Sequence, residues 1–147
     1  MFPMVTRWRM VEMFIARVDL ENVKSYERVS VAFRYGTNAI CGQNGAGKST
    51  LLEAIGFALF DHLAVTQDDF VRRGEKTATV TVAVEAEDGR VYEVVRRCGS
   101  SSAYYVYDAE LEQRLTDGKA ETMLWLQDFL GMEANADLAT LFRDAVG

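Results

Sequence analysis

The residues best suited to chemistry lie in one short segment, residues 41–50, which reads CGQNGAGKST. This segment matches the phosphate-binding pattern G-x-x-x-x-G-K-[ST] at every fixed position. Its glycines let backbone N–H groups curl around a polyphosphate, because no Cβ stands in the way. Lys48 is placed to reach the β and γ phosphates, and the Ser49 hydroxyl is placed to bind a Mg²⁺ that bridges them. The segment therefore predicts a nucleoside triphosphate site.

The segments on either side support this interpretation. Residues 37–41 read as a short buried strand that runs directly into Gly42, and residues 48–60 read as a helix. The N–H groups and the dipole of a helix N-terminus favour an anion. The helix is apolar nearly all round, with Glu53 as the exception, which predicts burial on several sides. A glycine-rich turn that matches the pattern by chance is the alternative.

The rest of the chain shows strand, turn and helix signals. Apolar residues alternate in residues 14–20, 29–33 and 77–85, as expected for half-buried strands. Asp88-Gly89 is a hairpin signal, and Thr116 or Asp117 can cap a helix that Gly131 ends. The predicted strands are 14–20, 29–33, 37–41, 77–85, 91–97 and 103–107; the helices are 48–60, 119–130 and a short one from Leu138; residues 21–26 form a turn and 61–76 are irregular.

These elements predict a mixed α/β domain, in which a parallel-sheet nucleotide core carries an added antiparallel β meander. A length of 147 residues suggests one domain, and a hydrophobic content of 49% is enough for a core. Residues 1–12 read as an irregular extension. No apolar run reaches membrane-spanning length and no secretory signal is visible, so we expect no membrane partner and a cytoplasmic location.

Composition limits the other possibilities. The net charge of −6 argues against a wholly basic nucleic-acid surface, although a local patch could still bind DNA. The tight basic pairs, Arg72-Arg73 and Arg96-Arg97, are expected at solvated strand edges or loops. Two cysteines and one histidine indicate neither a disulfide framework nor a zinc site. The histidine, His62, is expected to cap or flank the end of the loop helix.

An enzyme with this loop normally also needs an acidic residue at the end of a second apolar strand. Asp108 is the best match, since it follows an aromatic strand segment. Its neighbourhood reads as an antiparallel meander, which favours a turn aspartate instead. We therefore assign no catalytic residue and expect the chain to lack part of its own active site.

Two segments carry a family resemblance. Residues 15–26, IARVDLENVKSY, and residues 42–55, GQNGAGKSTLLEAI, resemble the N-terminal half-head of structural-maintenance-of-chromosomes (SMC) type ATPases. Within that family they look most like the SbcC-type DNA double-strand-break repair ATPase, which partners a nuclease. Residues 71–74, VRRG, and the hairpin over residues 77–97 are similar to the same branch. The resemblance implies a P-loop NTPase fold of the ABC/SMC-head type and makes residues 13–147 the N-terminal half-head.

The resemblance also implies roles for single residues. Lys24, where the family usually has arginine, would approach the phosphates, Ser25 would lie near the base or sugar, and Asn44 would face the γ phosphate and the attacking water. Without the family, Lys24 reads as an exposed turn lysine. Tyr26 could stack on adenine, as an upstream aromatic does in transporter-type ATPases, but packing in the core or at the surface is favoured. The nucleotide-binding residues are thus Lys24, Ser25, Gly42, Asn44, Gly45, Ala46, Gly47, Lys48, Ser49 and Thr50, with Ser49 on Mg²⁺.

What the resemblance implies for function is Mg-ATP binding, with ATP sandwiched between two heads. Its partners would be a C-terminal half-head joined through a coiled coil, a second copy of the head, a nuclease subunit and DNA. The remaining carboxylates would come from that C-terminal half, so we expect little or no hydrolysis by this chain alone. If central strands are missing, an unpaired apolar sheet edge would favour association.

Other functions stay open. A transporter-type ABC ATPase would need a metal-sensing glutamine, for which Gln67 is the candidate soon after the loop helix, and a membrane partner. A non-hydrolysing, nucleotide-responsive interaction module would bind ATP and change its association without turnover. A small-molecule kinase would need a lid with clustered arginines, which the sequence lacks.

Overall fold

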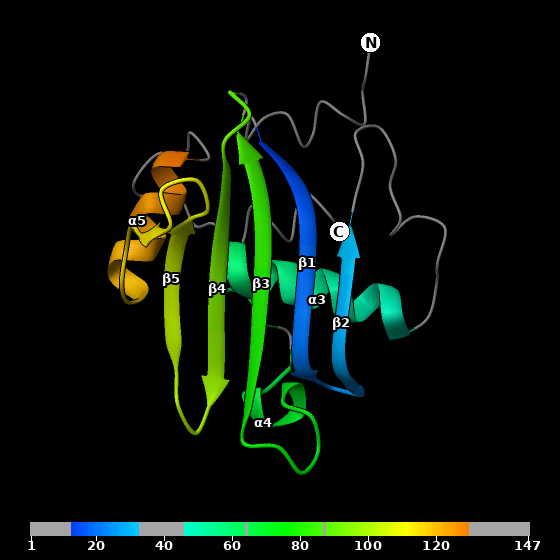
Figure 1. Ribbon diagram of the computed structural model, residues 1–147. Coiled ribbons are helices and arrows are strands. Elements are labelled where there is room, and N and C mark those ends of the chain that lie inside the picture. The colour runs from blue at the N-terminus through cyan, green and yellow to red at the C-terminus, as the bar shows by residue number, and fades with distance from the viewer. Residues whose placement is uncertain (1–12, 33–45, 64, 87, 130–147) are drawn as a thin grey trace.

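The computed structural model describes residues 13–32, 46–63, 65–86 and 88–129. Their strands form one 6-stranded antiparallel sheet in the order β2-β1-β3-β4-β5-β6. Helix α3 crosses behind this sheet, and α5 packs against β5 (Figure 1). The elements are β1 (Met13–Val23), β2 (Tyr26–Ala32), α3 (Ala46–Phe60), α4 (Gln67–Phe70), β3 (Thr77–Ala86), β4 (Val91–Gly99), β5 (Ala103–Asp108), β6 (Gln113–Arg114) and α5 (Lys119–Phe129).

Alternate residues of the central strands form the core beneath α3. In the sheet register, Val18 lies beside Val82, Val82 beside Val94, and Leu20 beside Val80, so these side chains share one face. All of them are fully or almost fully buried. Each such side chain contributes about 1.5–3 kcal/mol when it leaves water. The period-two pattern of the sequence therefore corresponds to the core face of the sheet.

Helix α3 is the element that this core face covers. It begins at Ala46, two residues before the predicted start, and its residues 54–60 are all buried, as the apolar pattern predicted. Asp61 follows with a left-handed φ of 54°, and the backbone N–H of His62 donates to the carbonyl of Gly56 at 3.0 Å. This is the bonding of a left-handed helix stop, so His62 does flank the helix end.

The antiparallel meander is confirmed, and it is continuous with the first two strands, because β3 pairs directly with β1. The turn at Asp88-Gly89 is also confirmed: the N–H of Gly89 donates to Ala86 at 2.9 Å, and Gly89 has a φ of 92°. Sequence patterns missed the short elements α4 and β6. The predicted strand at 37–41, the extension at 1–12 and the helix from Leu138 lie outside the described residues.

Helix α5 begins at Lys119, as predicted, but its capping differs from the expectation. The Thr116 hydroxyl accepts from the N–H of Val106 at 3.0 Å instead of capping the helix. The Glu121 carboxylate accepts from the N–H of Asp117 at 2.9 Å, which closes the first turn from within the helix. No helix in the described part of the chain combines the length and apolar character needed to cross a lipid bilayer.

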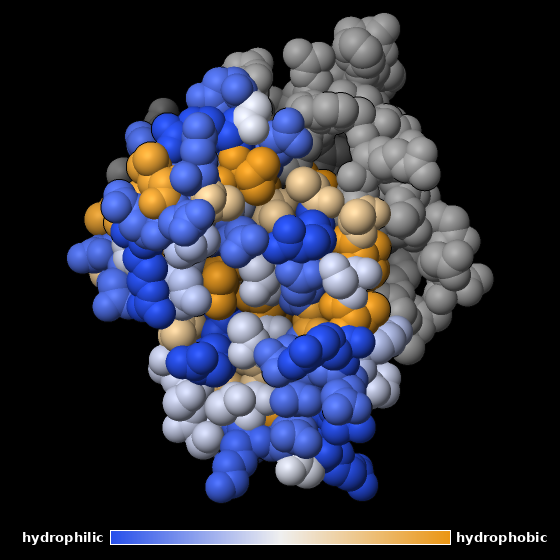
Figure 2. Space-filling view, in the orientation of Figure 1, coloured by the Kyte–Doolittle hydropathy of each residue, from blue (hydrophilic) through white to orange (hydrophobic). Residues whose placement is uncertain are grey.

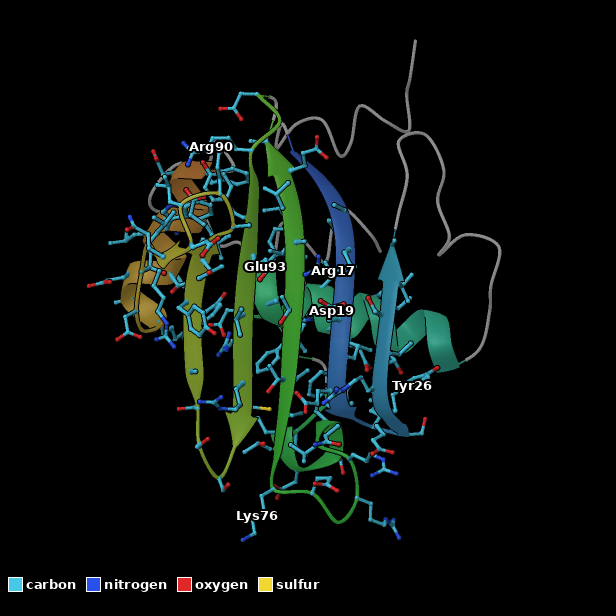
Figure 3. All side chains as sticks on the ribbon, viewed as in Figure 1. Arg17, Asp19, Tyr26, Lys76, Arg90 and Glu93 are labelled. Atoms are coloured by element: carbon cyan, nitrogen blue, oxygen red, sulfur yellow. The ribbon has the colours of Figure 1, made fainter. Side chains whose placement is uncertain are left out.

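The face of the sheet away from α3 carries a network of ion pairs. Arg17 donates to Asp19 at 2.7 Å and, across β3, to Glu93 at 2.8 Å. These hydrogen bonds, the one to Glu93 first, raise the pKa of Arg17. Figure 3 shows the three side chains close together, and Figure 2 shows a mixture of hydrophilic and hydrophobic residues over this face. Ala83 lies between Arg17 and Glu93 in the register and is 1% exposed, since the ion pair covers it.

We predict that Gly99→Ala is among the more damaging small substitutions in the sheet. Gly99 has a φ of 115°, and an added Cβ would lie 2.1 Å from the carbonyl oxygen of Lys76. The free energy of unfolding should fall by about 3 kcal/mol or more, measured by urea denaturation. Gly74→Ala is the matched control, because its φ is 89° but nothing lies within 4 Å; it should cost about 1–2 kcal/mol. Equal losses would show that the Lys76 backbone moves aside.

Candidate nucleotide-binding site

The N-terminus of α3 lies inside the phosphate-binding motif. The helix starts at Ala46, so residues 46–50 are helical, and Thr50 is buried. No acidic residue occurs in the first turn, so none there neutralises the partial positive charge of the helix end. This end of the helix therefore suits an anion such as a phosphate. The loop residues Gly42, Asn44 and Gly45, and the side chains of residues 46–49, lie outside what the structure describes, so their contacts stay predictions.

Lys24 is held against the same helix. It lies in the tight turn between β1 and β2 with a φ of 53°, and its backbone N–H donates to the carbonyl of Phe70 at 2.7 Å. Its ammonium nitrogen lies 2.5 Å from Oε1 of Glu53, and both side chains are half-buried. Glu53 is about two turns from the helix start. The predicted contact of Lys24 with phosphate is thus untested, while its attachment to α3 is established.

Glu53 is a partner that the sequence interpretation missed. The signal was present, because Glu53 is the one acidic residue of an otherwise apolar helix. A carboxylate in such a setting needs a cation, since a buried unpaired charge is costly. Sequence alone did not identify Lys24 as that cation, because the two residues meet only through the packing of the β1–β2 turn on α3.

The turn that carries Lys24 is fixed by the segment after α4. The N–H of Arg72 donates to the carbonyl of Asn22 at 2.8 Å, and Val71 forms a β-bridge with Val23. Phe70 anchors this segment, since it is fully buried and packs edge-on against Phe57 at 5.4 Å between ring centroids. The VRRG segment is one of those that carry the family resemblance. Its first two residues, Val71 and Arg72, therefore hold the Lys24 turn.

Three other residues considered for nucleotide or metal contacts, Ser25, Tyr26 and Gln67, differ in how far they are exposed. Ser25 is exposed in the turn, and its predicted position near the base or sugar stays a prediction. Tyr26 is half-buried and packs against the core, which supports the packing role. Gln67 is exposed at the start of α4, whose cap is the Thr66 hydroxyl accepting from the N–H of Asp69.

The opposite end of α3 is held by Arg96, and here the expectation of a solvated arginine was wrong. Arg96 lies beside Val80 in the register, on the core face, and its side chain is 12% exposed. Its guanidinium stacks between the rings of Phe57 and Tyr104, at 4.2 and 4.1 Å from their centroids. Arg73, from the other basic pair, is exposed as expected. The cause is the sheet register, which a pair of adjacent arginines cannot reveal.

Arg96 also satisfies polar groups at the helix end. Its Nη1 donates to the carbonyl of Phe57 at 3.1 Å and to Oδ1 of Asp61 at 2.9 Å. Lys119 approaches Oδ2 of Asp61 at 3.0 Å. Burial acts to raise the pKa of Asp61, but the hydrogen bonds and charges of Lys119 and Arg96 outweigh it, so the pKa lies below its ordinary value of 3.8. Asp61 is therefore held as a carboxylate.

Tyr104 completes the packing at this end. Its hydroxyl donates to the carbonyl of Ala58 at 2.5 Å, and burial raises its pKa far above the ordinary value for tyrosine. The group is consequently a permanent donor to α3 over the physiological pH range. Burial likewise raises the pKa of Cys98, a free thiol in the core, which makes it a packing residue.

Asp108 stabilises the turn after β5, as the surrounding sequence predicted. Its Oδ1 accepts from the N–H groups of Glu110 and Leu111 at 2.9 and 3.1 Å. Its Oδ2 accepts from Arg90 at 2.5 Å, and the residue is buried. Both carboxylate oxygens are thus engaged in holding the end of β5.

We predict a pH-dependent contribution of Asp61 to stability. Because its folded pKa is depressed, the contribution is full above the unfolded pKa of about 3.9 and is lost as pH falls through the folded pKa. The wild type should therefore be more stable than Asp61→Asn at pH 7, and the difference should shrink toward pH 3. Urea denaturation of both proteins at several pH values measures this. A difference that stays constant with pH would show that the ion pairs of Asp61 do not stabilise the fold.

The chain is similar in sequence to known DNA repair ATPases. The chain is 44% identical over 82 residues to the DNA double-strand break repair Rad50 ATPase of Methanopyrus kandleri, covering 56% of the chain and 9% of the relative. It is 31% identical over 135 residues to that of Thermoplasma volcanium, covering 88% of the chain and 15% of the relative. These relatives confirm the predicted resemblance to the double-strand-break repair branch. The chain spans only a small part of their length.

A solved structure and a sequence family complete the comparison. The structure of the recombination mediator protein RecF-ATP in the RecFOR pathway superposes with a TM-score of 0.54 at 19% identity, over 72% of this chain and 28% of that one. This likeness supports the predicted fold class, a P-loop NTPase of mixed α/β architecture. The sequence pattern of the AAA domain matches residues 17–134, which is most of the chain. The chain therefore belongs to the AAA domain family.

Proposed function

We propose that this chain is the Mg-ATP-binding, N-terminal part of the head of an SMC-like DNA double-strand-break repair ATPase. The observation that carries the proposal is the start of a buried helix inside the sequence GQNGAGKST, with no carboxylate in its first turn. Such an end offers N–H groups and a favourable dipole to a polyphosphate. The names of the relatives support a repair ATPase rather than a transporter or a kinase.

In this proposal the motif residues divide the work on the nucleotide. Gly42, Gly45 and Gly47 let the backbone wrap the phosphates, and Lys48 reaches the β and γ phosphates. The hydroxyl of Ser49 binds Mg²⁺, which supplies charge neutralisation to the phosphates when it is bound. Asn44 faces the γ phosphate. Ala46 and Thr50 belong to the helix that follows, and Lys24 approaches from the β1–β2 turn, with Ser25 near the base or sugar.

In this proposal the complete ATPase includes protein segments outside this chain. The relatives are many times longer, since the chain spans 9–15% of them. We infer that a C-terminal half-head, joined through a coiled coil, provides the missing carboxylates, and that a second head closes the nucleotide between the two. A nuclease subunit and DNA would be the partners, and the cytoplasm the location. ATP binding would then drive engagement of the heads, and hydrolysis would release them.

Nucleotide binding is tested directly by calorimetric titration of ATP and Mg²⁺ into the chain. We expect saturable binding, and a loss of about 10- to 100-fold in affinity for Lys48→Ala, because a charge-assisted contact to phosphate is removed. Lys76→Ala is the matched control, since Lys76 is exposed in the loop that leads into β3. The same samples should show no measurable ATP turnover. No binding by the wild type, or equal binding by Lys48→Ala, would refute the proposed site, and clear turnover would refute the incomplete active site.

The role of Lys24 can be separated from that of Glu53. A double-mutant cycle with Lys24→Met and Glu53→Gln should give a coupling energy of about 1 kcal/mol in urea denaturation, because the pair is half-buried. The exposed pair Arg28–Glu21 should give less than about 0.5 kcal/mol. If Lys24 also contacts phosphate, Lys24→Met weakens ATP binding whereas Glu53→Gln does not. If Lys24→Met and Glu53→Gln change ATP affinity equally, the role of Lys24 is structural and it does not contact phosphate.

A further inference from the structure

The two ends of α3 differ in what they contact. The N-terminal end carries the phosphate-binding residues, while the C-terminal end meets β4 and α5. Figure 1 shows the helix crossing behind the sheet from β2 to β4. With 15 residues it is about 22 Å long. Residues 54–60 are all buried, so the close-packed core resists local bending of the helix.

The C-terminal end is clamped by three different elements. From β4, Arg96 donates to the last turn and to Asp61. From β5, the Tyr104 hydroxyl donates to Ala58. From α5, Lys119 pairs with the second oxygen of Asp61 at 3.0 Å. Cations at this end also complement the negative pole of the helix dipole.

The two cations of this clamp differ in how they are held. Arg96 is enclosed by the rings of Phe57 and Tyr104, so its position is set by packing. Lys119 is 64% exposed, and its described ion pair is the one with Asp61. The ion pair between α5 and the end of α3 is consequently made by a surface side chain whose replacement should leave the core intact. The buried Tyr104 hydroxyl contacts both Ala58 of α3 and, at 3.4 Å, Sδ of Met123 in α5, and it is unaffected by that replacement.

We propose that Asp61, Arg96 and Lys119 are positioning residues for the phosphate-binding helix, and that through them α5 is coupled to nucleotide binding. This inference rests on the proposed function. The clamp sets where α3 lies along its axis and therefore where its first turn meets the phosphates. Coupling between two sites is reciprocal. Binding of a nucleotide at the N-terminal end of α3 must therefore change the stability of α5.

A direct electrostatic effect does not explain such a coupling. Asp61 and Lys119 lie at the far end of a helix about 22 Å long. Charges in water at physiological salt are screened over about 8 Å. An effect of Lys119 on ATP affinity must therefore pass through the position or rigidity of α3.

Two substitutions test the clamp without removing core side chains. Asp61→Gly abolishes both ion pairs but suits the left-handed backbone at φ 54°, so the helix stop is kept. Lys119→Met removes only the ion pair between Asp61 and α5. Lys76→Met is the matched control, because it removes one exposed lysine charge away from α3.

We expect Asp61→Gly to weaken ATP binding about five- to tenfold in titration calorimetry. The loss of its ion pairs should also lower the melting temperature, so binding is measured at a temperature where both proteins are fully folded. In hydrogen exchange, ATP should slow the amides of residues 119–129 in the wild type, and this response should be lost in Lys119→Met. Lys76→Met should keep both the affinity and the response.

The outcomes separate the two proposals. If the wild type binds no ATP, the proposed function fails and takes this inference with it. Suppose that the wild type binds ATP, that Asp61→Gly binds it equally well, and that ATP does not change the amide hydrogen exchange of α5. The proposed coupling through the clamp is then refuted, and the proposed function stands. An α5 response to ATP in Lys119→Met equal to that of the wild type would overturn it too, since the contact of Lys119 with Asp61 would then be only structural.

Discussion

Burial of helix α3 against the sheet is the constraint on which the rest of the structure depends. A helix that is apolar nearly all round must be covered on several sides, and residues 54–60 are all enclosed. The core faces of β1, β3 and β4 cover one side of the helix, and Phe70 at the end of α4 covers part of another. The gain in hydrophobic free energy is thus tied to the placement of the element that begins in the phosphate-binding motif.

A buried helix leaves its polar groups to be satisfied by other elements. Glu53 is paired by Lys24 from the β1–β2 turn, and the last carbonyls are met by Arg96 and Tyr104. These contacts hold the helix at its middle and at its C-terminal end, while the first turn has no acidic neighbour within it. In the proposed function the N-terminal end of α3 binds the triphosphate, and the buried and paired remainder of the helix supplies the fixed position that precise recognition requires.

The single antiparallel sheet makes these contacts possible. Because β3 pairs with β1, the hairpin over β3 and β4 is joined to the turn that carries Lys24, and one sheet contacts α3 through β1, β3 and β4. On its other face, the pair between Arg17 and Glu93 passes over Ala83, where a larger side chain would separate the two. The sheet is therefore specified on both faces, by apolar packing beneath α3 and by ion pairs opposite.

Local patterns in the chain were enough to predict strands β1 to β5, the Asp88-Gly89 hairpin and helices α3 and α5, but not the short elements α4 and β6. Each depends on residues that are close in sequence, through side-chain period, turn geometry or helix capping. The partners of Glu53, Arg96 and Asp61 could not be predicted in this way. Arg96 and Asp61 are 35 residues apart, and only the register of β4 turns Arg96 toward the helix end. Sequence thus determined the main strands and helices and carries the phosphate-binding motif, whereas tertiary packing decided which charges meet, because that depends on how distant segments align in space.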